Sequence, residues 1–316
     1  MAPLAAPGPL EGAVQCGHGE RPRGARDPRG PRSPHHRPGP RVNHDLVVAT
    51  VQWLPAPGQA EHNLATALSL VDQAARRGAS VVVLPELWPC GADPASMADD
   101  ARAAAEPLSG PRLAALGRAA QAHHLWLVAG SVPELADGRL FNTAPVLDPE
   151  GCLVAAHRKC HLYPPFGEPG LFDAGDRLTC FAGPATTTIG LVVGFEGDFP
   201  EVARALGHGG AQLVVSPCAT PLSGSARWDL LAPAAALANG QWWVQADQGG
   251  THGTSTLLGA SRILAPTGTV VAEAARALPG TTPAPEILVH RVDLDAGEAD
   301  ETAELLAAGR RPELYV

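Results

Sequence analysis

The sequence predicts an α/β fold on the basis of two observations. From Asp45 onward, short runs of β-branched and aliphatic residues alternate with segments of helical periodicity, which is the pattern of strands separated by helices. The chain has 316 residues, and 45% of them are hydrophobic, so residues 45–316 can bury a sizeable core as one domain. The net charge of −9 argues against general nucleic-acid binding, which needs a basic surface. No apolar run is long enough to suggest a membrane span.

Residues 1–44 form a region of different composition. Arg and Pro dominate residues 21–32, and hydrophobic periodicity is absent, so a disordered extension is expected. A basic arm that binds an anionic surface is the alternative interpretation. The N-terminus lacks the apolar core of a signal peptide. None of the six cysteines forms a CxxC pair, and reduced thiols in a cytoplasmic protein are therefore the expectation.

The individual elements follow from local patterns. The β-branched run at 46–51 predicts a buried strand. Apolar residues at helical spacing over 64–75 predict a helix, which Gly78 ends. A second strand is expected at 80–84, where Pro85 interrupts the ladder of hydrogen bonds. The remaining elements are expected as helices at 113–122 and 230–238 and as strands at 125–130, 189–193, 213–216, 242–245, 263–264 and 286–292.

The most specific motif begins where the strand at 189–193 ends. The chain continues there as Gly-Phe-Glu-Gly-Asp-Phe-Pro-Glu over 194–201. This segment resembles the nucleophile elbow of the nitrilase, or carbon–nitrogen hydrolase, superfamily, in which the strand runs into Cys-Tyr/Phe-Asp-x-Arg-Phe-Pro-Glu. In that family the Cys thiolate attacks the carbon of a nitrile or amide. The resemblance places Gly194 at the Cys position, and glycine cannot form the covalent intermediate that this mechanism requires.

Further motifs extend the resemblance over almost all of residues 46–315. Segments similar to family motifs occur, in the family's order, at 49–52, 81–87, 157–162, 266–270 and 310–315. Each motif alone is weak, but the ordered set is specific. The resemblance implies a four-layer α-β-β-α sandwich that forms a homodimer or a higher homo-oligomer. It also implies a small-molecule substrate or ligand.

The resemblance further implies a set of catalytic residues. Glu86 matches the family's general base, Lys159 matches its catalytic lysine, and Glu168 matches a second glutamate of the amidase branches. Amide hydrolysis needs a base for proton transfer and a fixed positive charge beside the developing oxyanion. We therefore expect the three side chains to converge in one pocket. The alternative is an ordinary ion pair, or charges that lie far apart on the surface.

The departures from the family pattern cluster around the missing thiol. Besides Gly194, the usual Asp is Glu196, and the usual Arg is Asp198. An Arg-to-Asp change reverses the charge and removes five hydrogen-bond donors. A family Glu further along appears as Ala238. These coordinated differences indicate a natural divergent member rather than a single inactivating substitution.

Other residues are candidates for the site. Cys218 follows the strand at 213–216 and could be a relocated nucleophile, although a small buried hydrophobe is the commoner role. His157 and His161 flank Lys159 and could line the pocket, but the spacing supplies no third metal ligand. We therefore expect no metal and no cofactor. The candidate pocket-lining residues are Trp88, Tyr163, Phe195, Glu196 and Cys218.

Two classes of function remain compatible with the sequence. The first is an enzyme that acts on a small amide-like or nitrile-like metabolite without a thiol, by water activation, elimination, cyclisation or condensation. The second is a pseudoenzyme that binds a ligand or serves as a scaffold. Buried charges cost stability unless they are compensated, so their retention favours a working polar pocket.

Overall fold

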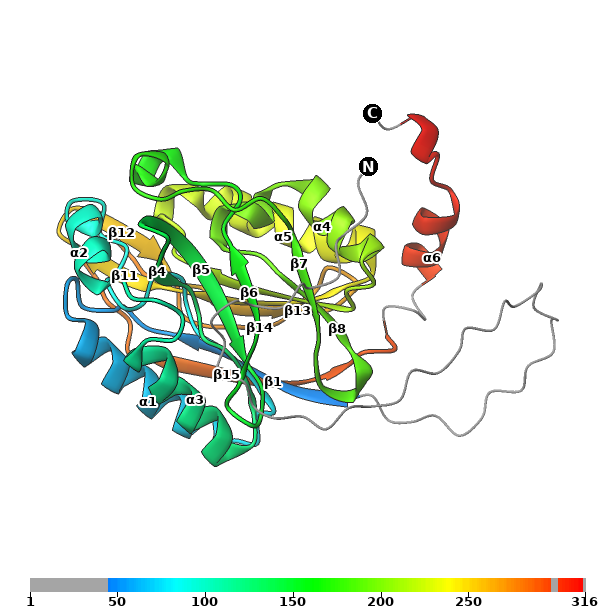
Figure 1. Ribbon diagram of the computed structural model, residues 1–316. Helices are drawn as coiled ribbons and strands as arrows, with labels where there is room; N and C mark the ends of the chain where they lie inside the picture. The colour runs from blue at the N-terminus through cyan, green and yellow to red at the C-terminus, as the bar shows by residue number, and fades with distance from the viewer. Residues whose placement is uncertain (1–44, 297–300, 315–316) are drawn as a thin grey trace.

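Two β-sheets pack face to face between two layers of helices (Figure 1). The computed structural model describes residues 45–296 and 301–314, so the prediction for residues 1–44 lies outside the described residues. The predicted four-layer α-β-β-α sandwich is confirmed. None of the helices within the described residues combines the length and the apolar character needed to cross a membrane.

The first sheet has seven strands in the order β15-β1-β2-β3-β5-β4, with β6 paired to β5. The parallel pairs β1–β2 and β2–β3 form its centre, and the remaining pairs are antiparallel. The strands are β1 (Asp45–Gln52), β2 (Val81–Val83), β3 (Trp126–Val128), β4 (Val132–Ala136), β5 (Arg139–Leu147), β6 (Leu153–Arg158) and β15 (Glu286–Asp293).

The second sheet has six strands in the order β14-β13-β10-β9-β8-β7. Strands β8, β9 and β10 are parallel, so their carboxyl ends meet at one edge. The strands are β7 (Thr179–Ala182), β8 (Thr188–Leu191), β9 (Leu213–Cys218), β10 (Trp242–Asp247), β13 (Arg262–Leu264) and β14 (Val270–Glu273). A separate hairpin joins β11 (Gly249–His252) to β12 (Ser255–Leu258).

Helices cover the outer face of each sheet. Helix α1 (Ala60–Arg76) buries Asn63, Ala67, Leu70, Val71 and Ala74, which recur at helical spacing. Together with α3 (Pro111–His123), it packs on the first sheet. Helices α4 (Pro200–His208) and α5 (Ser225–Asn239) cover the second sheet. The shorter helices are α2 (Met97–Ala104) and α6 (Glu301–Ala308).

Three apolar clusters hold these four layers together. The central cluster combines residues of both sheets, such as Val81 and Val128 from the first and Val215 and Val244 from the second. The other two clusters lie between each sheet and its helices. The sheets therefore share a largely apolar interface.

The elements differ from the sequence expectations at several points. Helix α5 begins at Ser225 rather than near residue 230, and it continues through Pro233. The sequence patterns do not predict the strands β4 to β7, β11, β12 and β14 or the helices α2, α4 and α6. Strand β5 is buried along nearly its whole length, so it lacks the alternation that marks a half-exposed strand.

Cys90, Cys160, Cys180 and Cys218 are free thiols, whereas Cys152 is disulfide-bonded, contrary to the expectation of reduced thiols throughout.

Candidate active site

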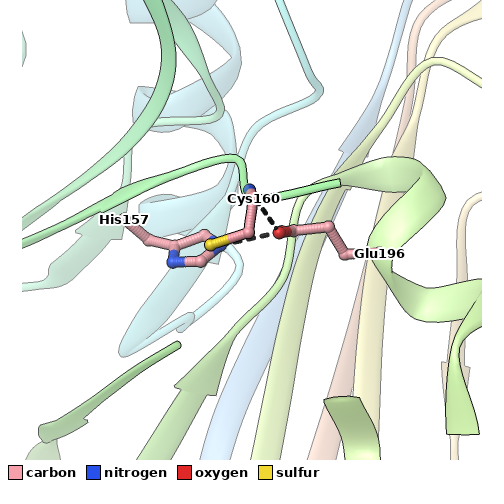
Figure 2. A group of neighbouring side chains, drawn as sticks. All are labelled: His157, Cys160 and Glu196. Carbon is pink, nitrogen blue, oxygen red and sulfur yellow. Dashed lines mark hydrogen bonds and ion pairs between the residues drawn. The ribbon is translucent and has the colours of Figure 1, made fainter. Parts of the chain in front are cut away.

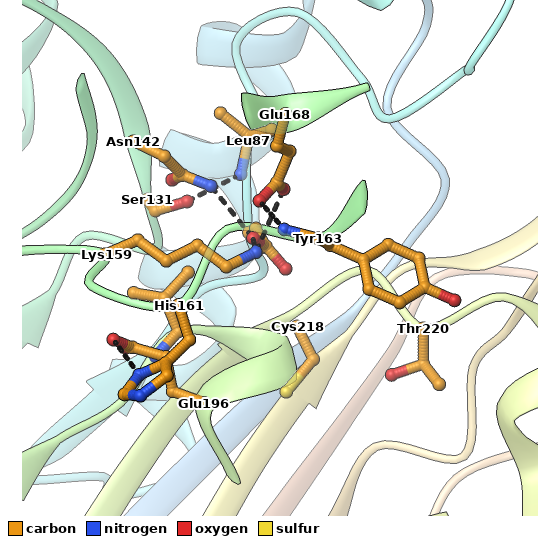
Figure 3. A network of polar contacts seen from close by, with 12 residues as sticks. Leu87, Ser131, Asn142, Lys159, His161, Tyr163, Glu168, Glu196, Cys218 and Thr220 are labelled. Atoms are coloured by element: carbon orange, nitrogen blue, oxygen red, sulfur yellow. Dashed lines mark hydrogen bonds and ion pairs between the residues drawn. The ribbon is translucent and has the colours of Figure 1, made fainter. Parts of the chain in front are cut away.

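The structure brings Glu86, Lys159 and Glu168 together; Figure 3 labels Lys159 and Glu168 of this group. Lys159 Nζ donates to Glu86 Oε1 at 2.7 Å and to Glu168 Oε1 at 2.9 Å. All three side chains are buried. Because an ammonium group carries three N–H donors, one donor of Lys159 is left for a bound molecule.

Backbone contacts fix the position of each member of this trio. Glu86 follows β2; its N–H donates to the carbonyl of Cys218, and its own carbonyl accepts from Gln248 Nε2 at 2.6 Å. Lys159 directly follows β6. Glu168 begins a short 3₁₀ turn, and its Oε2 accepts the backbone N–H of Tyr163 at 2.7 Å. The trio therefore joins three separate segments of the chain.

Asn142 is a fourth member of this network that the sequence did not reveal. It lies on β5, and its Nδ2 donates to Glu86 Oε1 at 2.9 Å (Figure 3). Oxygen Oε1 of Glu86 thus accepts from both Asn142 and Lys159. No described residue donates a hydrogen bond to Oε2, which leaves this oxygen free to accept a proton.

Burial and the neighbouring charges together set the pKa values of Glu86 and Lys159. Burial raises the pKa of Glu86; Lys159 opposes this effect, Glu168 reinforces it, and the net pKa is above the ordinary value of 4.5. Burial alone would lower the pKa of Lys159, but Glu86 and Glu168 raise it above 10.5, so the ammonium form is favoured. The site therefore combines a lasting cation with a carboxylate of enhanced basicity.

Gly194 faces Glu86 at the start of the short helical turn η4 (Gly194–Asp198). Its φ of +50° is a left-handed conformation that glycine adopts at little cost. A Cβ at this position would approach Glu86 Oε2 more closely than 3.0 Å, a distance that real Cβ atoms do not reach. Gly194 therefore provides no nucleophilic side chain, and the Glu86 carboxylate occupies the adjoining space.

Glu196 holds the turn η4 in place through buried contacts. It is fully buried, and its carboxylate accepts the backbone N–H of Cys160 and contacts His157 Nε2, each at 2.7 Å (Figure 2). It also accepts the backbone N–H of Val193 at 2.7 Å. Burial alone would raise the pKa of Glu196. The charge and hydrogen bond of His157, with further hydrogen bonds, lower it well below 4.5 instead.

The same contacts decide how the His157, Cys160 and Glu196 cluster is interpreted. The three side chains lie close enough together to surround a metal ion. However, both Glu196 oxygens already accept hydrogen bonds, and His157 Nδ1 lies 3.2 Å from Thr179 Oγ1. The arrangement is that of a polar anchor between β6 and η4. His161 also lies outside the cavity lining and stacks on Phe199, with ring centroids 4.3 Å apart.

The acid at position 198 has a cationic partner from a distant segment. Asp198 Oδ2 accepts from Arg227 Nη1 at 2.5 Å. The Arg227 guanidinium also lies 5.7 Å from the ring centroid of Tyr163 and 5.6 Å from that of Phe195. The sequence analysis did not identify Arg227 as a site residue, although the unusual acid at position 198 indicated that a cation would lie nearby. The pair links η4 to the first turn of α5, and both residues line the cavity described below.

A cavity extends from the trio towards α5. About 40 Å³ of it is open to water-sized groups, enough for a few water molecules. Its lining includes Glu86, Lys159, Tyr163, Phe166, Glu168, Gly194, Phe195, Asp198, Thr220, Arg227, Trp228, Gln245 and Arg262. Of the candidate lining residues, Tyr163 and Phe195 face this cavity.

The other three candidate lining residues do not belong to the cavity lining. Trp88 is fully buried in the core, where its Nε1 donates to the carbonyl of Ala129 at 2.7 Å. Cys218 is 1% exposed, its Sγ lies 3.1 Å from Ser216 Oγ, and burial raises its pKa well above 9.0. Glu196 faces His157, as described above. An aromatic or thiol side chain has the same appearance in a sequence whether it packs in a core or lines a pocket.

Comparisons with known proteins agree with this geometry. The carbon-nitrogen hydrolase family model matches residues 47–300. The chain belongs to the carbon–nitrogen hydrolase family. It is 33% identical over 236 residues to the omega-amidase NIT2 of Xenopus tropicalis, covering 72% of this chain and 83% of the relative. This carbon–nitrogen hydrolase therefore has amidases among its relatives.

Solved structures give the same assignment for this carbon–nitrogen hydrolase. A cysteine-to-alanine mutant of the Nesterenkonia AN1 amidase, from the nitrilase superfamily, superposes with a TM-score of 0.70 at 27% identity, covering 87% of this chain and 97% of that one. Another form of that amidase carries the acetamide moiety of fluoroacetamide on its active-site cysteine; it superposes with a TM-score of 0.69 at 26% identity, covering 86% and 98%.

Proposed function

We propose that the protein hydrolyses a small amide by activating water directly, without a covalent intermediate. The observation that carries this proposal is the free Oε2 of Glu86, which faces Gly194 at the place where the family motif has its cysteine. A water molecule in the adjoining cavity would act as the nucleophile in place of the absent thiol. Relatives that are named amidases support the choice of an amide substrate.

The residues of the site supply each proton and charge that this reaction needs. Glu86 Oε2 removes a proton from the water as its oxygen attacks the amide carbon. The free N–H of Lys159 stabilises the oxyanion that forms. Glu86 then returns the proton to the departing nitrogen, so that the amide and water become a carboxylic acid and an amine or ammonia. Glu168 holds Lys159 in place and does not itself exchange a proton.

The experiment that tests this proposal is product release by the wild type, Glu86→Gln and Lys159→Met, assayed with a panel of small amides and nitriles. Loss of turnover by about 100-fold or more in both variants is expected. Glu150→Gln, at an exposed position, serves as the matched control. Equal product formation by all four proteins would overturn the catalytic role of the trio.

A pseudoenzyme that only binds a ligand is the second candidate function, because the missing nucleophile itself favours it. In that case no substrate is consumed, and the Glu86 and Lys159 variants change only ligand affinity or stability. A hydrolase with Cys218 as relocated nucleophile is a third candidate. Its burial and raised pKa count against a thiolate. An acyl adduct on Cys218, detected by intact-mass and peptide analysis, would establish that alternative instead.

A further inference from the structure

The residue after Glu86 has a backbone conformation that is unfavourable for its side chain. Leu87 has a φ of +47°, in the left-handed region that costs a non-glycine residue free energy, and it is 1% exposed. Such a conformation persists only where the surrounding structure holds it. Because Glu86 and Leu87 share a peptide bond, the contacts that hold Leu87 also determine where the Glu86 carboxylate lies.

Ser131, in the loop after β3, holds the chain on both sides of Glu86. Its Oγ accepts the backbone N–H of Leu87 at 2.9 Å (Figure 3), and its own backbone N–H donates to the carbonyl of Pro85 at 3.1 Å. Ser131 is completely buried. A Cβ atom at the preceding residue, Gly130, would overlap the Pro85 carbonyl, so the two segments lie as close together as their backbones allow. None of these contacts involves the carboxylate itself.

Gln248, which follows β10 in the second sheet, holds the same turn. Its Nε2 donates to the carbonyl of Glu86 at 2.6 Å, and the N–H of Glu86 donates to the carbonyl of Cys218 at 3.3 Å. Gln248 is also completely buried. The peptide groups on both sides of Glu86 are thus paired with segments from both sheets, which fixes the direction in which its side chain leaves the backbone.

Two buried amides that donate to Glu86 leave their own oxygen atoms unpaired. Gln248 donates to the Glu86 carbonyl, and Asn142 donates to its Oε1. Gln248 Oε1 and Asn142 Oδ1 are buried and have no hydrogen-bond partner among the described residues. An unpaired buried acceptor costs free energy. Together with the conformation of Leu87, these costs are concentrated around one carboxylate, as expected where function requires a geometry that stability does not favour.

We propose that Ser131 and Gln248 are positioning residues for the base: they hold the turn over residues 85–87 so that Oε2 of Glu86 faces Gly194. Neither residue belongs to the cavity lining, so each acts through the backbone of the turn rather than on a bound molecule. Their role in turnover rests on the proposed function, whereas the placement of the carboxylate does not.

Loss of either contact should move the carboxylate away from the groups that stabilise its ionised form. Burial raises the pKa of Glu86, and Lys159 and Asn142 oppose this effect. A carboxylate that shifts away from these two donors but stays buried should therefore have a higher pKa. A carbon-13 NMR titration of protein labelled at the glutamate side chains measures this pKa without any substrate, and Glu86→Gln identifies the signal. Ser131→Ala and Gln248→Met should each raise it.

Turnover of small amides provides the second measurement. Ser131→Ala and Gln248→Met should each reduce kcat by about 10- to 100-fold, because a misplaced base loses rate steeply. KM should stay within about twofold, since neither residue touches the substrate. Ser131→Thr keeps the hydroxyl group and should recover most of the loss. Ser80→Ala is a matched control: Ser80 Oγ accepts the backbone N–H of Val47 at 3.3 Å at the opposite end of β2, and its removal should change neither kcat nor the titration of Glu86.

Stability separates positioning from a purely structural role. In Gln248→Met one unpaired acceptor, Gln248 Oε1, disappears while the Glu86 carbonyl loses its donor, so the free energy of unfolding should change little although kcat falls. If Ser131→Ala does not fold, Gln248→Met decides the proposal through the same measurements. Unchanged kcat together with an unchanged or lower pKa of Glu86, in the variants that fold, would overturn it.

Failure of the proposed hydrolysis gives a different result. If the wild type consumes no amide, the hydrolysis is refuted, and the titration alone decides the positioning. Turnover that depends on Glu86 but not on Ser131 or Gln248, with an unchanged titration, would refute the positioning and leave the hydrolysis intact.

Discussion

Oxygen Oε2 of Glu86 lies so close to Gly194 that a Cβ atom at residue 194 would overlap it. The other carboxylate oxygen is held by Lys159 and Asn142, so the carboxyl group cannot turn aside without losing hydrogen bonds. The glycine and the glutamate therefore form a matched pair. A side chain at residue 194 and the present position of Glu86 exclude each other.

Restoring a cysteine should consequently impair the native reaction rather than improve it. Gly194→Cys and Gly194→Ala should each lower the free energy of unfolding by about 1–3 kcal/mol and reduce turnover, as measured by urea denaturation and product release. Weak thiol-dependent amide hydrolysis by the cysteine variant is compatible with this expectation. Gly253→Ala is a matched control, since Gly253 has a φ of +53° but open space around its Cβ position. A Gly194→Cys protein with unchanged stability and faster native turnover would contradict the prediction.

Removal of the buried cation should affect stability as well as activity. Lys159→Met leaves Glu86 and Glu168 buried without their shared partner, and breaking a buried ion pair costs about 3–5 kcal/mol. Adding Glu168→Gln to this variant should recover part of the loss because one uncompensated charge is removed. The free energy of unfolding of the single and double variants provides the measurement. Arg139→Met, at a largely exposed pair, should cause a much smaller loss. Equal losses for Lys159→Met alone and for Lys159→Met combined with Glu168→Gln would argue against charge as the cause.

The pH dependence of turnover should report the ionisation of Glu86. Burial raises its pKa above 4.5, and a general base must be ionised to accept a proton. The value of kcat/KM should therefore be maintained above the raised pKa and should fall as the pH decreases through it. Because Glu168 contributes to raising this pKa, Glu168→Gln should move the acidic limb of the profile to lower pH. A profile that stays flat down to pH 4.5, or a shift to higher pH in that variant, would be inconsistent with Glu86 as the base.

The sequence predicted the fold and the central trio because both depend on local motifs. Glu86 and Lys159 each lie in a motif next to a strand end, so their approach follows once the strands are placed. Arg227 could not be assigned in this way, since its role arises from its contact with Asp198, 29 residues earlier in the chain. Sequence spacing gives no information on such pairs.

Burial explains the remaining errors in the predicted site. Trp88 follows β2 and Cys218 ends β9, positions that often line a site, but both side chains are buried in the core, where apolar and thiol side chains are equally suited. Glu196 occupies a motif position next to Gly194, yet it turns towards His157 and the backbone. The direction of the Glu196 side chain depends on φ and ψ of the short turn η4, and this local geometry is not apparent from residue types.

Glu196 provides a prediction about stability that is independent of any substrate. Burial raises the pKa of Glu196, but the charge and hydrogen bond of His157, with hydrogen bonds from His161 and the Cys160 backbone N–H, hold its folded-state pKa well below 4.5. A carboxyl group with a lowered pKa stabilises the folded state fully above its unfolded-state pKa, and this contribution is lost as the pH falls below that value. Glu196→Gln should thus lower the free energy of unfolding by roughly 3–5 kcal/mol at pH 7.

The pH dependence separates this electrostatic effect from a loss of packing. The difference in unfolding free energy between wild type and Glu196→Gln, measured by urea denaturation, should stay constant over neutral and mildly acidic pH and shrink as the pH falls below about 4.5, the usual pKa of a glutamate side chain. Glu150→Gln, at an exposed position, should show no comparable difference at any pH. Glutamine has nearly the same shape as glutamate. A difference in unfolding free energy that persists unchanged at low pH would therefore mean that the amide disturbs the packing of η4. In that case the ionised carboxylate would not be what holds this turn in place beside Gly194.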